Sequence, residues 1–290
     1  MILVTGANGQ LGRVVIEHLI ERGEAGGVAG LVRDRSKAAE LEARGVDLRV
    51  GEYDDVASLD AAMKGVEKVL LISGTERNEQ DSLRQHGNVV EAAGRAGVRF
   101  IAYTGRAMKD PEASENNLMG RHFKTEALIR ESGLDHALFR NALYMETIPY
   151  YVGKKGEPFD ADIRLPAAHG RVAYALRGEL GEGIANALLR GDGECRVYTL
   201  TGGEAWSFDD VARSLGKLSG KPVTYTPTDK AAFEARMREQ GAPEAMILLL
   251  YGFYCDIRDG QLDEVTPELE ELLGRKPASL EGGLKAIFNL

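Results

Sequence analysis

Short apolar runs alternate with longer amphipathic segments over the first half of the chain. The apolar runs cover residues 2–5, 28–32, 46–50, 68–73, 99–104 and 136–139. Each has a length typical of a buried strand, and the segments between them carry apolar residues at helical spacing. Most of these segments end in a glycine, which readily adopts the left-handed conformation that terminates a helix. The pattern predicts alternating strands and helices, with a parallel sheet covered by helices on both faces.

The alternation becomes irregular after residue 140. Residues 141–170 carry turn residues and aromatic side chains with no clear period, and residues 171–203 then return to strand and helix patterns. Ser207 is expected to be the N-cap of a helix over residues 208–219, and the chain from about residue 221 is expected to be mostly helical. We therefore predict an α/β fold, a Rossmann-type doubly wound parallel sheet built by residues 1–140 and completed by segments near 171–205. A smaller, mostly helical substrate lobe takes residues 141–170 and 206–290.

Three glycines interrupt the first strand–helix connection, in the sequence VTGANGQLG. In this context Gly6 permits a tight turn, Gly9 lets the backbone approach a diphosphate, and Gly12 lets the helix lie close to the sheet. The phosphates then face the N–H groups at a helix N-terminus. The alternative is that the glycines only make a turn, but the surrounding alternation of strands and helices favours a dinucleotide site.

The end of the second strand indicates which dinucleotide is bound. A carboxylate here binds the ribose 2′-hydroxyl of NAD(H), whereas an arginine accommodates the 2′-phosphate of NADP(H). The chain has Arg33, followed by Asp34, Arg35 and Lys37, a basic group in an acidic protein. We therefore predict NADP(H), with Arg33 and Lys37 among its ligands. Two alternatives stay open: Asp34 turns toward the ribose and admits NAD(H), or Arg35 and Lys37 belong to the solvated start of a helix.

Two further strand ends are expected to border the cofactor, because the carboxyl ends of parallel strands meet at one edge of a sheet. Tyr53, between Glu52 and Asp54, follows the third strand and is predicted to flank the adenine. Ser73 and Gly74 end the fourth strand and are predicted to run beside the cofactor.

The composition narrows the class of partner. The 290 residues are 43% hydrophobic and carry a formal net charge of -9, which disfavours a nucleic-acid partner. Cys195 and Cys255 are isolated, without the spacing of a disulfide framework or a zinc site, as is typical of a reducing compartment. The longest apolar run, residues 245–255, is too short to cross a membrane, and the first strand begins directly, without a signal-peptide pattern. We expect a cytoplasmic protein with a small-molecule substrate and no membrane partner, and we consider a homodimer as its oligomeric form.

Several longer motifs resemble those of one known family. The segments VTGANGQLG, GVEKVLLISG, GVRFIAYTG, HFKTEALIRESGL and FRNALY, with the later VYTLTGGEAWSFDDVARSLGKLSGKPVTY, are together similar to the NmrA-like group of atypical short-chain dehydrogenases. The resemblance covers most of the chain, is strongest over residues 1–145, and is greatest to the quinone-reducing and triphenylmethane-reducing members. It implies NADPH-dependent reduction of quinones or of cationic aromatic dyes.

The resemblance also implies roles for individual residues. His122 and the segment 141–144 lie toward the substrate side in this family, and we assign His122 and Tyr144 to catalysis. For His122 the alternative is a partly buried, hydrogen-bonded histidine with no chemical role, and for Thr104 it is an ordinary threonine at a strand end. From the motifs and the resemblance together, the residues expected at the cofactor are Gly6, Asn8, Gly9, Gln10, Leu11, Gly12, Arg33, Lys37, Tyr53, Ser73, Gly74, Thr104 and Asn141.

One departure from ordinary short-chain dehydrogenases bears on the chemistry. Those enzymes use a tyrosine and a lysine four residues apart to move the alcohol proton, but Lys124 has Gly120 four residues before it. We expect the chain to lack this pair. A quinone needs the pair less than a ketone does, because the incoming hydride gives a delocalised, phenolate-like anion, and a cationic dye needs no proton at all. The protein would then act mainly by holding the nicotinamide against the plane of a flat acceptor.

A flat acceptor requires apolar walls. The candidates are Tyr144, Met145, Tyr150, Tyr151 and Phe159 in the irregular segment, and Tyr251, Phe253 and Tyr254 in the later apolar helix. The alternative is that these side chains form the core of the lobe. The remaining histidines, His18, His86, His136 and His169, have no metal-like spacing, so we predict no metal site.

Two classes of function stay open at this point. The first is a reductase that transfers a hydride from NADPH to a quinone or similar conjugated acceptor. The second is a regulatory protein that binds NADP without turnover and senses its redox state, as some NmrA-like proteins do. A sugar-nucleotide epimerase is disfavoured, because that chemistry needs the tyrosine to remove a hydroxyl proton.

Overall fold

A seven-stranded sheet organises the first of the two structural units of the chain. The computed structural model describes residues 1–290 except 75, 77, 114–116, 153–161 and 191–194. The first unit contains residues 1–106, 118–141 and 177–199, and the second contains residues 107–117, 142–176 and 200–290. Residues 171–176 and 200–205, which the sequence suggests for the sheet domain, belong to the second unit. They do so because the strand over residues 171–172 pairs with the strand over residues 206–207, and because Gly202 packs against the carbonyl of Tyr174.

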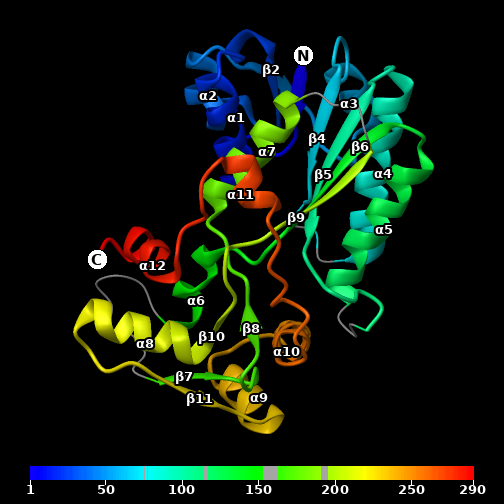
Figure 1. Cartoon of the computed structure of the whole chain (residues 1–290). Coiled ribbons are helices and arrows are strands. Elements are labelled where there is room, and N and C mark those ends of the chain that lie inside the picture. Colours follow the sequence, from blue (N-terminus) through cyan, green and yellow to red (C-terminus); the bar gives the residue numbers. More distant parts are fainter. Residues whose placement is uncertain (75, 77, 114–116, 153–161, 191–194) are drawn as a thin grey trace. The chain divides into compact units, whose positions relative to one another are not determined.

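The sheet of the first unit has the strand order β3-β2-β1-β4-β5-β6-β9 (Figure 1). All neighbouring pairs from β3 to β6 are parallel. The direction of strand addition reverses between β1 and β4, and such a switch point is where open α/β sheets bind their ligands. The predicted α/β, Rossmann-type fold is therefore confirmed. The strands are β1 (Ile2–Val4), β2 (Val28–Val32), β3 (Asp47–Val50), β4 (Lys68–Ile72), β5 (Phe100–Arg106), β6 (Asp135–Asn141) and β9 (Arg196–Leu200).

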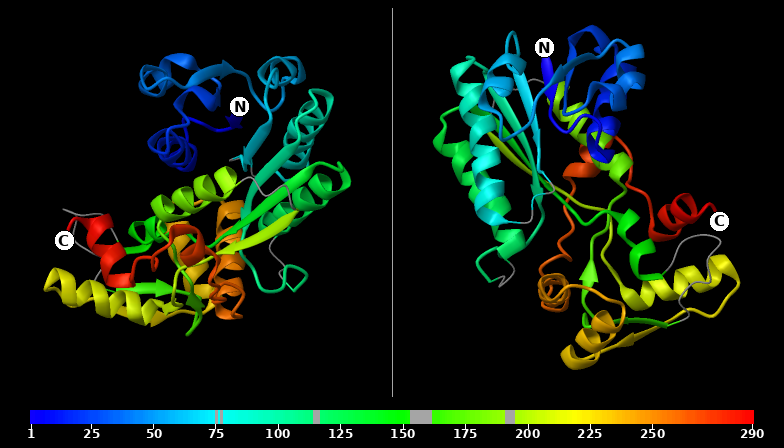
Figure 2. Two further views of the ribbon diagram at one scale, coloured as in Figure 1. Left: turned by 45° about the horizontal axis from the view of Figure 1, so that its top comes forward. Right: turned by 180° about the vertical axis from the view of Figure 1, so that it is seen from behind.

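Helices cover both faces of this sheet, with α4 and α5 along one face and α1 and α7 on the other (Figure 2). The side with α3 and α4 encloses a core of apolar strand residues that includes Leu3, Val69 and Ile101. On the other side α1 and α7 pack closely, because a Cβ at Gly181 would lie 2.4 Å from Cγ1 of Val14. The helices are α1 (Gln10–Glu21), α2 (Ala39–Ala43), α3 (Val56–Ala62), α4 (Glu79–Arg95), α5 (Asn117–Glu131) and α7 (Arg177–Arg190), with the short 3-10 helices η1 (Ala25–Gly27) and η2 (Arg35–Ala38).

The second unit is mostly helical and has its own apolar core around Phe208, Tyr254 and Leu284. Ser207 is the N-cap of α8, as predicted, and forms a capping box with Asp210. Two short strand pairs, β8 with β10 and β7 with β11, were not expected from the sequence. Among the described residues, no helix is both long enough and apolar enough to cross a membrane. The elements are η3 (Met145–Thr147), α6 (Pro149–Val152), β7 (Asp162–Leu165), β8 (Arg171–Val172), β10 (Trp206–Ser207), α8 (Phe208–Ser219), β11 (Thr224–Pro227), α9 (Lys230–Glu239), α10 (Glu244–Arg258), α11 (Glu268–Leu273) and α12 (Leu280–Phe288).

Candidate functional site

The glycine turn between β1 and α1 leaves no room for side chains on its inner side. Gly6 has a φ of +57°, and its carbonyl oxygen accepts a hydrogen bond of 2.8 Å from the N–H of Gly9. A Cβ at Gly12 would lie only 2.3 Å from that carbonyl oxygen. Helix α1 can therefore begin this close to β1 only with a glycine at position 12, while Gly6 and Gly9 stay exposed on the outer side of the turn.

The N-terminus of α1 is open to an anion. Its N-cap, Gly9, has no side chain to bind the first backbone N–H groups, and the first turn contains no acidic residue. Gln10 is exposed and Leu11 is buried, so Gln10 faces outward while Leu11 anchors the helix. Free N–H groups together with the helix dipole favour a phosphate at this position.

Arg13 is a residue of this region that the sequence reasoning missed. Its Nη2 and Nε donate to Oδ1 of Asn8 at 2.6 and 3.0 Å, and its Nη1 pairs with Glu40 at 2.9 Å. Nη2 also reaches the carbonyl oxygen of Lys37 at 3.3 Å. The guanidinium thus joins the glycine turn to the segment that follows β2. Only its place in the first turn of α1, next to a glycine motif, could have indicated this role.

The three basic residues after β2 differ in whether an acidic side chain pairs with them. Arg33 is exposed and forms no hydrogen bond or ion pair with any residue that the structure describes. Arg35 is paired with Glu42, and Lys37 lies 3.8 Å from Asp34. Hydrogen bonds from Ser36 lower the pKa of Asp34, so that its carboxylate is committed to the start of η2. Of the four residues, Arg33 is therefore the best placed for an incoming phosphate.

The hydroxyl of Tyr53 points into the sheet edge. It donates to the carbonyl oxygen of Ile72 at 2.8 Å and lies 2.5 Å from Oγ1 of Thr5, which in turn accepts from the N–H of Ile72 at 2.9 Å. Because Tyr53 has only one hydroxyl proton, Thr5 must donate to it, and the three groups form a closed ring of hydrogen bonds. Tyr53 thus joins the ends of β1 and β4, so that only its ring is available to an adenine.

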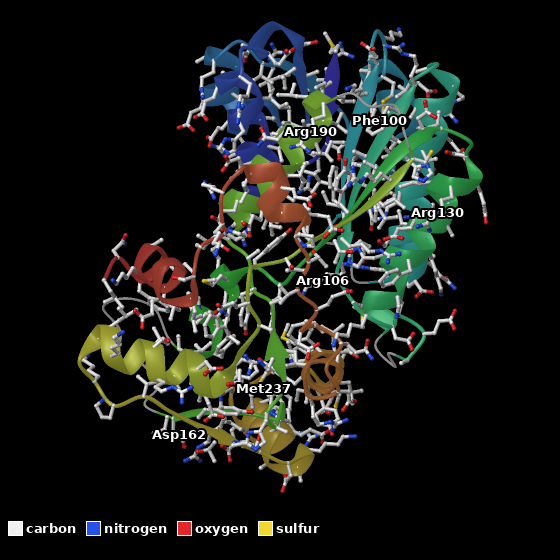
Figure 3. All side chains as sticks on the ribbon, in the orientation of Figure 1. Phe100, Arg106, Arg130, Asp162, Arg190 and Met237 are labelled. Carbon is white, nitrogen blue, oxygen red and sulfur yellow. The ribbon has the colours of Figure 1, made fainter. Side chains whose placement is uncertain are left out.

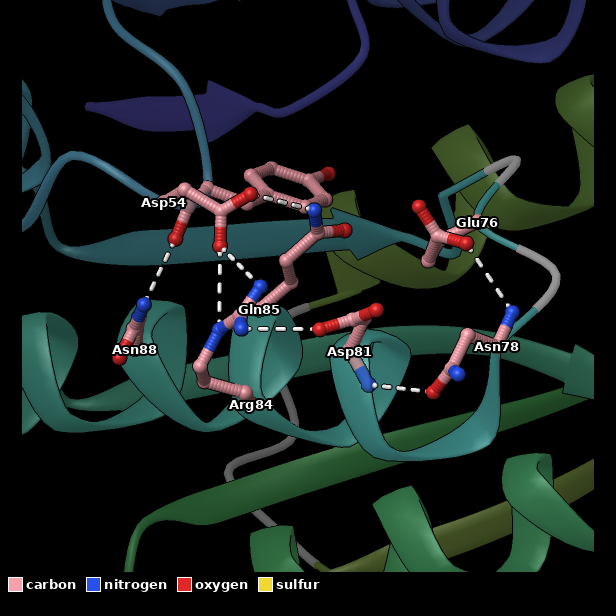
Figure 4. Close-up of polar contacts among 8 residues, drawn as sticks. Asp54, Glu76, Asn78, Asp81, Arg84, Gln85 and Asn88 are labelled. Atoms are coloured by element: carbon pink, nitrogen blue, oxygen red, sulfur yellow. Dashed lines mark hydrogen bonds and ion pairs between the residues drawn. The ribbon is translucent and has the colours of Figure 1, made fainter.

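Asp54, next to Tyr53, is held by α4 (Figure 4). Its carboxylate accepts hydrogen bonds from Arg84 at 2.8 Å and from Gln85 at 2.7 Å. Asn78, the N-cap of α4, accepts from the N–H of Asp81 and is itself bound by Glu76. These contacts fix the loops after β3 and β4 against one helix.

Two buried side chains accept hydrogen bonds from the backbone that follows β4. The N–H of Ser73 donates to Oγ1 of Thr104 at 3.1 Å, and the N–H of Gly74 donates to Nε2 of His86 at 3.3 Å. Thr104 is 2% exposed, and this bond agrees with its alternative interpretation as a structural threonine at a strand end. Its contact with the cofactor stays a prediction, as do those of Ser73 and Gly74.

His122 lies on α5 beside β5, near whose carboxyl end Arg106 is found (Figure 3). Its Nδ1 is 2.8 Å from the hydroxyl of Tyr103, and the side chain is buried. Burial, followed by the positive charges of Arg121 and Arg106, lowers the pKa of His122 to about 3. The imidazole is therefore neutral near pH 7 and can donate or accept a hydrogen bond, but cannot act as a cationic acid.

Asn141 ends β6, directly opposite Arg106 of β5 in the sheet register. Its side chain is 1% exposed, and neither Nδ2 nor Oδ1 has a hydrogen-bond partner within the described part of the chain. A buried amide without partners is costly, so such a group indicates a ligand that supplies both a donor and an acceptor. A carboxamide, as in nicotinamide, has these two groups.

The expectation that the chain contains no tyrosine–lysine pair is wrong as a statement about spacing. Tyr150 precedes Lys154 by four residues, and Tyr151 precedes Lys155 likewise, but both lysines lie outside the described residues. Tyr150 is 83% exposed, and the hydroxyl of Tyr151 lies 2.9 Å from that of Tyr174 in the second unit. The helix α5 itself has no such pair, because Gly120 stands four residues before Lys124.

The side chains predicted to form the walls of the acceptor site differ in burial: some lie in the core of the second unit, and others lie nearer its surface. Met145 and Tyr254 are buried in its core, and the ring of Tyr151 packs edge-on against Phe208. Tyr144 is half-buried at the start of η3, where its carbonyl oxygen accepts from Thr147. Tyr251 and Phe253 are half-buried, and Phe159 lies outside the described residues. The core alternative thus agrees with Met145, Tyr151 and Tyr254, and substrate contact by Tyr144 stays a prediction.

The parallel sheet, the glycine turn and the open N-terminus of α1 define a dinucleotide-binding α/β protein. A family model described as NAD(P)H-binding matches residues 6–167. Quinone oxidoreductase 2 of Escherichia coli is 34% identical over 291 residues, covering 100% of this chain and 99% of the relative. The chain therefore belongs to the NAD(P)H-binding, NmrA-like family, which confirms the resemblance seen in the sequence.

Two solved structures of cofactor complexes are similar to the whole chain. An NADPH-dependent quinone oxidoreductase from Escherichia coli, complexed with NADPH, has a TM-score of 0.91 at 34% identity, covering 100% of both chains. A triphenylmethane reductase from Citrobacter sp., complexed with NADP(H), has a TM-score of 0.90 at 33% identity, covering 99% of this chain and 100% of that one. The glycine turn and the unpartnered amide of Asn141 are the features of this chain that fit such a cofactor.

Proposed function

We propose that this protein is an NADPH-dependent reductase that transfers a hydride to a quinone or a similar conjugated aromatic acceptor, cationic dyes included. One observation carries the proposal: the chain aligns over nearly its full length with quinone and triphenylmethane reductases. The glycine turn, which excludes side chains, agrees with it. When bound, NADPH supplies the hydride, and the protein supplies binding and orientation.

The cofactor residues follow from the groups that the fold leaves open. The glycine turn and the N-terminus of α1 bind the diphosphate, and Asn8 is held beside them by Arg13. Arg33, assisted by Lys37, binds the 2′-phosphate that distinguishes NADPH from NADH. Asn141 pairs with the carboxamide of the nicotinamide, which would satisfy both of its polar atoms.

The electronic nature of the acceptor follows from the absence of the tyrosine–lysine pair on α5. A ketone needs a positioned proton donor, whose contribution is about 10²- to 10⁴-fold. A quinone spreads the new negative charge over its ring, so a neutral hydrogen-bond donor such as His122 is sufficient, and water can protonate the product afterwards. We further propose Tyr144 as an aromatic contact of this acceptor. A homodimer and a cytoplasmic location, the latter from the isolated cysteines, complete the proposal.

The test is NADPH oxidation, followed by absorbance, with a panel of quinones and cationic dyes. We expect turnover with at least one class, and none with Gly12→Val, which cannot form the turn. NADPH binding without turnover across the whole panel would instead support the sensor alternative. Failure to bind either coenzyme in calorimetry would refute both.

A further inference from the structure

The strand β5 contributes a tyrosine that touches the proposed catalytic histidine. Tyr103 is completely buried, and its hydroxyl lies 2.8 Å from Nδ1 of His122, with the ring centroids 6.2 Å apart. A neutral imidazole carries one N–H and one lone pair, and the partner of Nδ1 decides which nitrogen holds the proton. The direction of this single hydrogen bond therefore fixes what His122 can offer to a substrate.

The neighbouring hydrogen bonds favour one direction. Nε2 of His86 accepts from the backbone N–H of Gly74, so its proton is on Nδ1, which donates to Oγ1 of Thr125 at 2.9 Å. Thr125 in turn donates to the carbonyl oxygen of Arg121 at 3.0 Å. The proton of Thr125 is thus already used and is not available to Tyr103.

The hydroxyl of Tyr103 is then a buried donor that needs an acceptor. Among the described residues, it has two hydrogen-bonding neighbours: Nδ1 of His122 at 2.8 Å, and the side chain of Thr125, whose oxygen already accepts from His86. If Nδ1 carried the proton instead, the Tyr103 O–H could turn only to the Thr125 oxygen, which already accepts from His86 and donates to Arg121. The lone pair of Nδ1 is therefore the better acceptor. Burial also raises the pKa of the Tyr103 phenol, so that it stays protonated and remains a donor.

We propose that Tyr103 is a positioning residue that holds His122 in its Nε2–H tautomer, so that Nε2–H donates to the carbonyl oxygen of the acceptor. The hydrogen bond from Nε2–H to the acceptor rests on the proposed function, whereas the tautomer of His122 does not depend on it. Nε2 forms no hydrogen bond within the described ranges, whereas Nδ1 is engaged by Tyr103. His122 acts as a neutral donor and loses no proton in the reaction.

The direct test is the tautomer itself, measured by long-range ¹H–¹⁵N NMR on protein labelled with ¹⁵N-histidine. The His122 signals are assigned by their loss in His122→Gln. We expect the Nε2–H tautomer in the wild type, and a mixture of tautomers in Tyr103→Phe, which keeps the buried ring but removes the hydroxyl. His86 is the internal control and should remain Nδ1–H in both proteins. An Nδ1–H tautomer at His122 in the wild type, or an unchanged tautomer in Tyr103→Phe, would overturn the inference.

The kinetic test separates positioning from a general loss of structure. Tyr103→Phe should lower kcat about threefold to tenfold, in proportion to the lost productive tautomer, with the KM for NADPH unchanged. Equal damage to the KM for NADPH would indicate a structural role and count against the inference. If no acceptor is turned over by the wild type, the proposed function fails, but the NMR measurement still decides the role of Tyr103.

Discussion

Replacing Asn141 by leucine should make the cofactor-free protein more stable while weakening its binding of NADPH. The amide is 1% exposed, and both of its polar atoms lack partners in the described part of the chain. Each unsatisfied buried donor or acceptor costs about 1–3 kcal/mol, and leucine has nearly the same shape without polar atoms. Imperfect packing of the new side chain offsets up to about 1.5 kcal/mol. With two such atoms, we expect a net gain of about 0.5–6 kcal/mol in the free energy of unfolding.

NADPH should reduce this difference in stability. If the amide forms two hydrogen bonds of about 0.5–1.5 kcal/mol each with the carboxamide, Asn141→Leu raises the Kd for NADPH about fivefold to a hundredfold. At a ligand concentration 100 times its Kd, the wild type gains about 2.7 kcal/mol, and the variant gains less at the same concentration. Urea unfolding with and without NADPH, together with calorimetric titration, measures both effects.

Asn88→Leu is the matched control for this experiment. The Asn88 amide donates to the carbonyl oxygen of Tyr53 at 2.9 Å, so the same substitution removes an existing hydrogen bond. It should lower the free energy of unfolding by about 1 kcal/mol. If Asn141→Leu is destabilising to a similar extent, its amide is already satisfied, for example by a bound water, and the reasoning from the unpartnered atoms is refuted.

Four further predictions concern the cofactor and the buried histidines. Arg33→Asp should raise the KM for NADPH strongly and that for NADH much less, because only NADPH carries the 2′-phosphate; equal losses in steady-state kinetics would exclude this contact. Gly12→Ala should weaken calorimetric binding of both coenzymes about a hundredfold, since its Cβ would lie 2.3 Å from the carbonyl oxygen of Gly6; unchanged binding would show that the turn can move. Burial lowers the pKa of His86 to about 4, below its value of about 6.5 in the unfolded chain, so its stabilising contribution is complete above pH 6.5 and is lost as the pH falls toward 4. Between pH 6.5 and pH 5, urea unfolding should therefore show a loss about 1–2 kcal/mol larger for the wild type than for His86→Gln. His122→Ala should lower kcat by less than about a hundredfold, and a larger loss would indicate true acid catalysis.

The sheet could be predicted from the sequence because its strands are buried on both faces. Runs such as residues 28–32 and 69–72 therefore appear as continuous apolar segments, and each lies in a strand of the structure. The pairing of β7 with β11 could not be predicted in this way. Its partners, Asp162 and Thr224, lie far apart in the sequence, and both strands are short and partly polar. Such a pairing depends on tertiary contacts rather than on local pattern.

The candidate site was predictable only where a residue type by itself implies a chemistry. The glycines and Arg33 could be recognised because a close backbone approach and a 2′-phosphate each require a particular residue. Arg13 and Tyr103 could not, because their importance comes from what they touch. Arg13 is one of many helical arginines until its contact with Asn8 is known, and Tyr103 is one apolar position in a buried strand until its hydroxyl meets His122.

At the carboxyl edge of the sheet, some polar groups form hydrogen bonds within the protein, and others are available to ligands. The polar groups of Thr5, Tyr53 and Thr104 are used to join the ends of β1, β4 and β5. Within the described residues, the groups at this edge that have no partner include the first N–H groups of α1, the guanidinium of Arg33, Nε2 of His122 and the amide of Asn141. These groups match, in turn, a diphosphate, a 2′-phosphate, an acceptor oxygen and a carboxamide. Because a buried polar group is costly unless a partner arrives, the Asn141 amide is the member of this set for which a ligand gives the largest gain.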